Sequence, residues 1–218
     1  MLSFRVLVIA ALLGSLPAAA VRAAGTVQVH CVDTKNQPVA DAVAWLTPLD
    51  VTPVLAPPAK PLVIEQQDQE FRPYVTPVVV GTRISFPNHD TVQHHVYSVS
   101  KPKPFEIPLY RGESKEAVLF DHPGIVTIGC NIHDWMIAYV LVLATPYYAK
   151  SADAGIAVIS SLPPGHYRLE VWHPRLAAEV TRAVTVAETD TSPQVITMTL
   201  KPDRRIRRAP DASGGGYK

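Results

Sequence analysis

The sequence has few cysteines, and its positive and negative charges nearly balance. Its 218 residues include only two cysteines, Cys31 and Cys130, so a framework of several disulfides is excluded. The formal net charge is +1, which excludes a bulk electrostatic attraction to nucleic acid. No nucleic-acid partner is therefore expected.

Long apolar runs and helical periodicity are also missing. After residue 24 no stretch reaches the length of a transmembrane span without interruption, so no span is expected in the mature protein. No window of a dozen residues repeats its apolar positions with a helical period. Instead, 21 prolines and 11 glycines separate short runs rich in Val, Ile and Thr, and this pattern predicts an all-β protein.

Residues 1–23 have the features of a secretory signal peptide. Arg5 supplies the positive charge and Val6–Leu16 the apolar core, and either Ala18–Ala20 or Val21–Ala23 is a small-residue cleavage site. The apolar core of about 11 residues is too short to span a bilayer, and an uncleaved anchor is the alternative. The mature protein is expected in the periplasm or outside the cell.

The residues with the most distinctive chemistry lie in Gly129–Met136. Cys130, His133 and Met136 follow one another at three-residue intervals between two apolar runs, which predicts a strand, a short loop and a strand. A thiolate, an imidazole and a thioether suit copper. A zinc site is the first alternative, although zinc needs four firm ligands and no second cysteine lies nearby. A chance cluster of core residues is the second.

Cys31 has a different setting from Cys130. It alternates with Val27 and Val29 in a predicted strand, so it is expected to be a buried free thiol. A disulfide between Cys31 and Cys130 is the alternative in an oxidising compartment.

A second histidine follows a predicted strand–turn–strand at Val78–Phe86. The pattern V-x-x-G-T-x-I-x-F-x-N-x-D-x-x-x-H-x-V, followed by P-G-x-V-x-I-G-C-x-x-H-x-x-M, resembles the small type 1 (blue) copper proteins. These are cupredoxins of the plastocyanin, amicyanin and pseudoazurin kind. The arrangement is also similar to periplasmic proteins described as methylamine-utilization or plastocyanin-like. The resemblance covers about residues 62–143.

The resemblance implies a copper ion with four ligands, namely His94, Cys130, His133 and Met136. His95 stands where these relatives usually have asparagine and is the alternative ligand. Neighbouring strand residues face opposite sides, so His94 and His95 are not expected to bind the same metal. Asn88 is expected beside the site, as a neighbour of the ligands or an alternative one.

The function implied is that of an exported mononuclear type 1 copper protein that shuttles single electrons between a donor and an acceptor protein. Four protein ligands leave no position for substrate, so an electron carrier is expected, not an enzyme. By the same resemblance His133 is the ligand nearest solvent, and Ile132, Trp135 and Ile137 are expected to form an apolar docking patch. Packing of Trp135 in the core is the alternative. Asp134 departs from the proline that relatives often have after the loop histidine.

Two other functions stay open. A copper-binding or delivery module that docks a partner is one, although such modules usually expose Met-rich stretches and this chain has three methionines. A subunit of a copper oxidoreductase is the other. That reading needs histidines beside the cysteine, where Gly129 and Asn131 stand instead.

Both ends of the chain carry a second resemblance. The patterns V-x-V…D-x-x-x-x-P-V-x-D-A-V-x-W-L and L-P-P-G-x-Y-x-L-x-V-W resemble a carboxypeptidase-regulatory-like or transthyretin-like β-sandwich. The expected fold is therefore a cupredoxin Greek-key sandwich or barrel, residues 58–143, inserted in or joined to a small Ig- or transthyretin-like sandwich, residues 24–57 and 144–202. Residues 203–218 are expected to be a flexible basic tail. Simple succession of two or three β units is the alternative.

Overall fold

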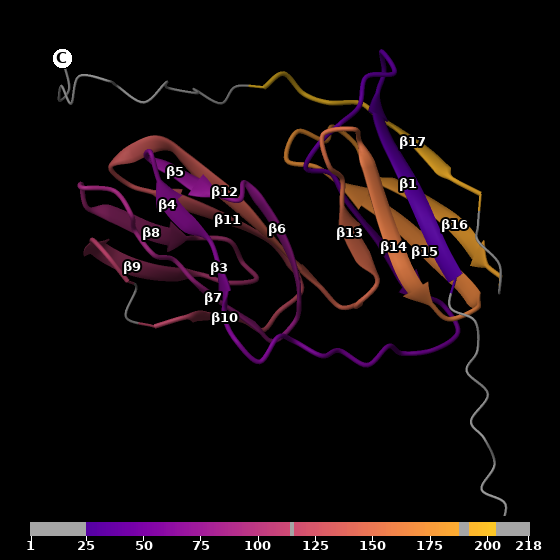
Figure 1. Ribbon diagram of the computed structural model, residues 1–218, viewed down its shortest axis with the longest axis horizontal. Coiled ribbons are helices and arrows are strands. Elements are labelled where there is room, and N and C mark those ends of the chain that lie inside the picture. Colours follow the sequence, from indigo (N-terminus) through magenta and orange to yellow (C-terminus); the bar gives the residue numbers. More distant parts are fainter. Residues whose placement is uncertain (1–24, 114–115, 188–191, 204–218) are drawn as a thin grey trace, which may run out of the picture.

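A computed structural model describes residues 25–113, 116–187 and 192–203 of the chain (Figure 1). These residues form seventeen strands and no helix, which confirms the prediction of an all-β protein. None of them belongs to a helix that is long and apolar enough to span a bilayer. The predicted signal peptide and all but the first residue of the predicted tail lie outside the described residues.

Two sheets, which we call the flanking sandwich, contain the first two and the last five strands. One sheet has the strand order β14-β1-β17 and the other β13-β2-β15-β16. The strands are β1 (Gly25–Asp33), β2 (Val43–Pro48), β13 (Tyr148–Lys150), β14 (Ile156–Leu162), β15 (Gly165–Trp172), β16 (Val180–Val186) and β17 (Gln194–Met198).

The two sheets of the flanking sandwich share one apolar core. In β1 every second residue is buried, and Val27, Val29 and Cys31 point into this core, as the alternating sequence predicts. Leu46 of β2 and Leu169 of β15 reach it from the other sheet. Both cysteines of the chain are buried and free.

Ten strands between β2 and β13 form the rest of the fold, which we call the central sandwich. It has a five-stranded sheet of order β6-β12-β11-β8-β9, a three-stranded sheet of order β10-β7-β3 and the hairpin β4-β5. Its strands are β3 (Leu62–Val63), β4 (Glu65–Gln67), β5 (Glu70–Arg72), β6 (Val75–Val79), β7 (Thr82–Ser85), β8 (His94–Ser98), β9 (Phe105–Tyr110), β10 (Val118–Phe120), β11 (Gly124–Cys130) and β12 (His133–Leu143).

Strand β12 links the two sandwiches, which lie side by side in Figure 1. Its C-terminal residues Leu141 and Leu143 pack with Val43 of β2 and Val75 of β6 in a small core of their own. Its N-terminal residues lie at the opposite end, remote from the flanking sandwich. The domain boundaries at residues 57, 143 and 202 stay a prediction.

Gly155, which precedes β14, occupies a position that no other residue fits well. Its φ is +73°, and a Cβ there would lie 2.5 Å from the carbonyl oxygen of Cys31. We expect Gly155→Ala to lower the free energy of unfolding by about 2 kcal/mol, because backbone strain adds to this clash. Denaturant titration measures it.

Gly112 provides a matched control for that prediction. Its φ is +76°, yet a Cβ there meets nothing within 4 Å. Gly112→Ala should therefore cost only the strain, about 1 kcal/mol. Equal losses in the two variants would contradict a contribution from the contact of Gly155 with Cys31.

Candidate metal centre

The hairpin of β11 and β12 places two of the predicted ligands at its tip. Cys130 is the last residue of β11 and His133 is the first of β12, with only Asn131 and Ile132 between the strands. The predicted order of strand, loop and strand is thus right, but the loop is shorter than residues 129–136.

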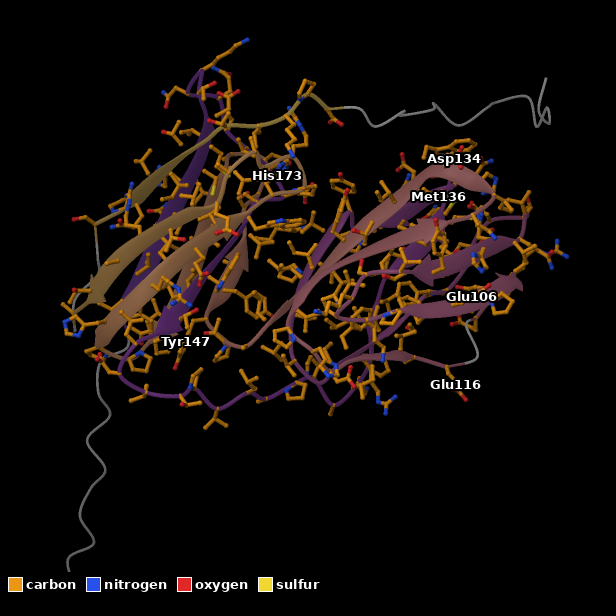
Figure 2. All side chains as sticks on the ribbon, turned by 180° about the vertical axis from the view of Figure 1, so that it is seen from behind. Glu106, Glu116, Asp134, Met136, Tyr147 and His173 are labelled. Carbon is orange, nitrogen blue, oxygen red and sulfur yellow. The ribbon has the colours of Figure 1, made fainter. Side chains whose placement is uncertain are left out.

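An irregularity in strand pairing shapes this tip. Gly129 pairs with Ile137, but the next residue, Cys130, pairs with His133, so residues 134–136 form a bulge on β12. A bulge changes which side chains point inward. His133 and Met136 are buried here, while Asp134 between them is exposed (Figure 2).

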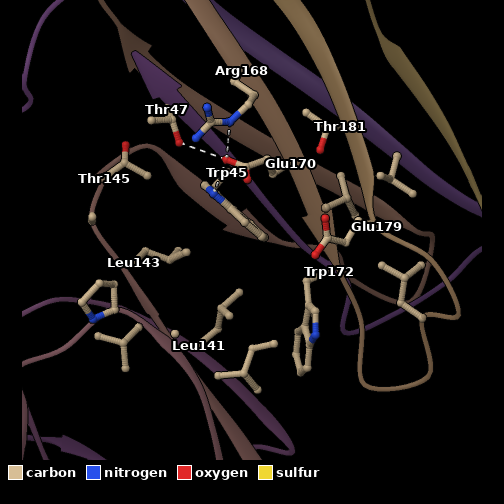
Figure 3. A pocket seen from close by; sticks show the side chains of 18 residues that line it. Trp45, Thr47, Leu141, Leu143, Thr145, Arg168, Glu170, Trp172, Glu179 and Thr181 are labelled. Carbon is tan, nitrogen blue, oxygen red and sulfur yellow. Dashed lines mark hydrogen bonds and ion pairs between the residues drawn. The ribbon is translucent and has the colours of Figure 1, made fainter. Parts of the chain in front are cut away.

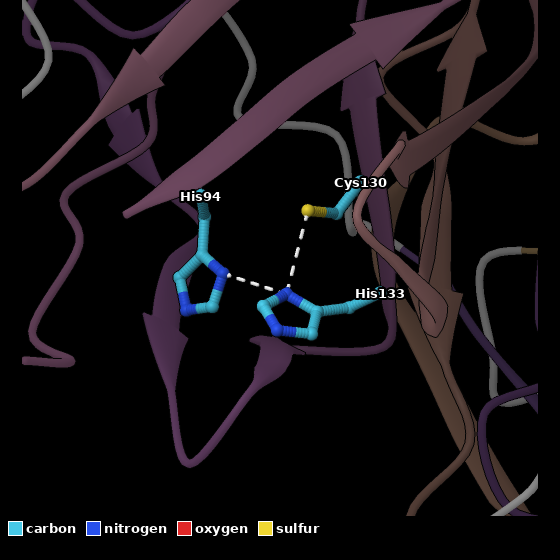
Figure 4. A group of neighbouring side chains, drawn as sticks. All are labelled: His94, Cys130 and His133. Atoms are coloured by element: carbon cyan, nitrogen blue, oxygen red, sulfur yellow. Dashed lines mark hydrogen bonds between the residues drawn. The ribbon is translucent and has the colours of Figure 1, made fainter. Parts of the chain in front are cut away.

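Three donor side chains converge beside this hairpin (Figure 4). Nδ1 of His94, the first residue of β8, lies 3.1 Å from Nδ1 of His133, which in turn lies 3.7 Å from Sγ of Cys130. One ligand atom from each residue lies within 4.8 Å of the others. The three residues are 0%, 7% and 4% exposed for His94, His133 and Cys130.

These separations fit donors to a single ion. Bonds of about 2.0 Å to nitrogen and about 2.3 Å to sulfur place two donors about 3.3–3.7 Å apart at tetrahedral to trigonal angles. The observed 3.1 and 3.7 Å differ from this range by at most a few tenths of an ångström. The cluster could therefore hold a metal ion without a large rearrangement.

Electrostatics favour a thiolate at Cys130. Burial raises the pKa of its thiol, but hydrogen bonds from His94 and from the backbone N–H groups of His95 and Ile132 outweigh burial and hold that pKa below its usual range. The thiolate is the form that binds metals. The protein thus stabilises the metal-binding form of Cys130 before any ion arrives.

The two histidines of the cluster differ in their electrostatics. Burial lowers the pKa of His94, but hydrogen bonds with Cys130 and Asp90 outweigh it, and the pKa lies above its usual value. Burial and the neighbouring charge of His94 both lower the pKa of His133. His133 is accordingly the ring that more readily stays neutral and keeps a lone pair for a metal.

Met136, the fourth predicted ligand, is buried in the core of the central sandwich. It is 2% exposed and belongs to the same apolar cluster as Cys130. Figure 2 shows it beside Asp134 near the tip of the hairpin.

His95 points away from the three-residue cluster. Its Nε2 lies 2.9 Å from Oε1 of Glu106 on β9, and its ring lies against that of Tyr97. The structure therefore brings His94, and not its neighbour, to Cys130 and His133. Strand alternation explains why only one of two adjacent side chains faces the site.

Asn88 supports the loop that precedes β8. Its Nδ2 donates to the carbonyl oxygens of Val92 and Tyr110, at 3.0 and 2.8 Å, and its Oδ1 accepts from the backbone N–H of Asp90 at 2.9 Å. The Asn88 amide therefore holds the backbone that leads to His94.

The sequence reasoning missed Asp90. Its carboxylate lies 2.7 Å from Nε2 of His94, on the side of the ring opposite to the cluster. The pattern that carries the resemblance includes Asp90, four residues before His94, but gave it no role.

Two of the three residues of the predicted docking patch, Ile132 and Trp135, lie beside His133. Ile132 is 41% exposed, and the Trp135 ring lies 5.2 Å from the His133 ring. Trp135 also packs against the core of the central sandwich, and Ile137 is partly exposed.

A separate cavity of about 500 Å³ lies between the two sandwiches (Figure 3). Trp45 and Trp172 line one wall, Leu141 and Leu143 the other. Glu170 accepts hydrogen bonds there from Nε1 of Trp45 and Oγ1 of Thr47, and it forms an ion pair with Arg168. None of the four predicted copper ligands lines this cavity.

Three solved structures are similar to part of the chain. A copper-containing nitrite reductase from Thermus scotoductus SA-01 shares 25% identity at a TM-score of 0.37, over 44% of this chain and 25% of that one. A reduced mutant of amicyanin shares 19% identity at a TM-score of 0.36, over 39% and 85% of the two chains. A purple cupredoxin from Nitrosopumilus maritimus shares 21% identity at a TM-score of 0.34, over 38% and 99%. No protein-family model and no curated protein matches the sequence.

Proposed function

We propose that this chain is a mononuclear type 1 copper protein that carries single electrons between redox partners. The observation that carries the proposal is the convergence of two imidazole Nδ1 atoms and one thiol sulfur in a buried site. Two histidines, a cysteine and a weak thioether are the donor set of blue-copper electron-transfer sites.

Each predicted ligand has a distinct role in this proposal. The Cys130 thiolate and the Nδ1 atoms of His94 and His133 would hold the ion, and Met136 would be a weak fourth ligand. Copper, when bound, supplies a one-electron couple. The strands fix the donors in a buried setting, so little rearrangement accompanies a change of charge at the site.

Electrons are proposed to enter and leave through His133. It is 7% exposed, whereas His94 is fully buried, so the ring of His133 is the ligand closest to solvent. Ile132 and Trp135 lie beside it, and together with Ile137 they would contact the donor and acceptor proteins. With no substrate position, the protein is proposed to be a carrier and not an enzyme.

The proposed setting is the periplasm or the exterior, reached through the signal peptide at residues 1–23. Residues 58–143 would form the copper domain and residues 24–57 with 144–202 the sandwich that flanks it. In support, the chain leaves the flanking sandwich after β2 and returns to it at β13.

Titration of the metal-free protein with copper and, separately, with zinc tests the proposal. We expect one equivalent of Cu(II) to produce an intense visible thiolate-to-copper band that disappears on one-electron reduction and returns on oxidation. A colourless protein that binds one equivalent of zinc more tightly than copper would overturn the assignment.

The same samples distinguish a carrier from a delivery module. A carrier keeps its copper through repeated reduction and oxidation in the presence of a moderate Cu(I) chelator. Release of the metal to the chelator in the first reduction would instead favour delivery.

A further inference from the structure

We propose that Asp90 is the positioning residue for His94, fixing its ring in the metal-binding orientation and lowering the reduction potential of the centre. This inference rests on the proposed function for its redox part, and on the described hydrogen bonds for its structural part. Asp90 is not one of the four predicted ligands.

The carboxylate of Asp90 is held from several sides. Its Oδ1 accepts the backbone N–H of Asp68 at 2.7 Å, and its Oδ2 accepts that of Gln69 at 2.9 Å. Both donors lie at the tip of the β4-β5 hairpin, where φ is +56° and +57°. Its own backbone N–H donates to Asn88. Two of these bonds hold the carboxylate itself and the third holds its backbone, so the carboxylate has little freedom to turn away from His94.

The contact with His94 selects one form of the imidazole ring. An ionised carboxylate has no proton to donate, so Nε2 of His94 must be the donor across the 2.7 Å contact. In a neutral ring the lone pair then belongs to Nδ1. That is the atom directed at Nδ1 of His133, as Figure 4 shows.

The charge of Asp90 also acts in a setting with little solvent. The side chain is 13% exposed and that of His94 is fully buried, so water screens the carboxylate weakly. A fixed negative charge beside a ligand stabilises Cu(II) more than Cu(I), since the two ions differ by one unit of charge. The reduction potential is therefore lower with Asp90 than without it.

Glu106 offers a matched comparison within the same strand pair. It contacts Nε2 of His95 at 2.9 Å, so it is also a carboxylate–histidine pair on β8. Its side chain is 69% exposed and its histidine lies outside the cluster. Glu106→Gln thus removes one negative charge, as Asp90→Asn does, but from a residue that contacts none of the four predicted ligands.

Voltammetry of copper-loaded Asp90→Asn and Glu106→Gln tests the redox part. Loss of a partner that orients a ligand typically weakens metal binding 10–100-fold. If this loss falls on Cu(II), the ion that the Asp90 charge stabilises more, the potential rises by about 60–120 mV in Asp90→Asn, because tenfold corresponds to 59 mV. Glu106→Gln should change the ratio of Cu(II) to Cu(I) affinity less than about threefold, since solvent screens the charge of Glu106. Equal shifts in the two variants would overturn the proposal.

Nitrogen-15 NMR of the metal-free protein tests the positioning part without copper. At a pH where both rings of the cluster are neutral, we expect His94 to carry its proton on Nε2 in the wild type. In Asp90→Ala this proton should exchange faster and the other tautomer should appear, while His95 is unchanged. A wild-type His94 protonated on Nδ1, or a spectrum unaffected by Asp90→Ala, would overturn the inference.

The two arms separate failure of this inference from failure of the proposed function. Absence of the visible band in copper-loaded wild type would reject the carrier assignment, and the metal-free spectra would still decide whether Asp90 positions His94. Thermal unfolding of each variant shows whether it is folded. If Asp90→Ala does not fold, the same NMR measurement is made on Asp90→Asn, which keeps an acceptor oxygen.

Discussion

The Cys130→Ser variant is expected to lose the visible copper band completely. A serine hydroxyl has a far higher pKa than the Cys130 thiol, whose pKa hydrogen bonds already hold below its usual range, so it supplies no thiolate and no sulfur-to-copper transition. Copper binding should weaken by more than the roughly 10–100-fold that follows the loss of an outer partner. Absorption spectroscopy and competition with a chelator measure both effects.

Cys31→Ala is the control for that result. Cys31 is the other buried free cysteine, but it lies in the core of the flanking sandwich and outside the His–Cys–His cluster. Its replacement should leave the band unchanged. A band that survives in Cys130→Ser and disappears in Cys31→Ala would contradict the assignment of the thiolate to Cys130.

At high pH the folded protein is expected to lose about 3 kcal/mol of stability through Cys31 alone. Burial raises the pKa of this thiol from 9.0 to about 11, and no charged partner offsets that cause. Each unit of pKa difference corresponds to about 1.4 kcal/mol. The two units between the unfolded and folded states therefore give about 3 kcal/mol.

The sign follows from where the proton is held. Below about pH 9 the thiol is protonated in both states, so Cys31 contributes no pH dependence. Between about pH 9 and 11 the unfolded chain loses the proton while the folded chain keeps it, and stability falls as pH rises. Above about pH 11 the folded thiol also ionises and the decline ends.

Denaturant unfolding under reducing conditions measures this effect as the difference between wild type and Cys31→Ala across that range. Tyrosines and lysines titrate in both proteins, so their contributions cancel in the difference. The alanine variant starts from a lower stability because the side chain is smaller, and only the change with pH is compared. Parallel curves for the two proteins would show that the buried thiol does not titrate as described.

Much of the fold follows from local sequence patterns. The alternation in Thr26–Val32 predicts which side chains of β1 are buried, because successive strand residues face opposite sides. The turn at Pro163–Gly165 and the alternation after it likewise predict β15, where Tyr167, Leu169 and Val171 are buried. These features depend only on residues close together in the chain.

Part of the candidate site is equally local. Cys130, His133 and Met136 lie within seven residues, so their spacing alone predicts that a hairpin brings soft and imidazole donors together. The bulge that buries His133 and Met136 was not predictable in this way. It depends on how β11 and β12 pair, and pairing register is a property of the sheet.

The sequence by itself determined the all-β character, the buried strand faces and the donor types of the candidate site. The resemblance named His94 as the ligand and His95 as the alternative, and the tertiary structure places His94 beside His133 and Cys130 while His95 contacts Glu106. Alternation requires that these neighbours differ but does not say which one faces the core. The hydrogen bonds from the β4-β5 hairpin to Asp90 join residues about twenty positions apart. The cavity beside Trp45 and Trp172 is lined by residues of β2, β12 and β15, which lie far apart in the sequence. Such contacts form only when distant strands pack, so no local pattern encodes them.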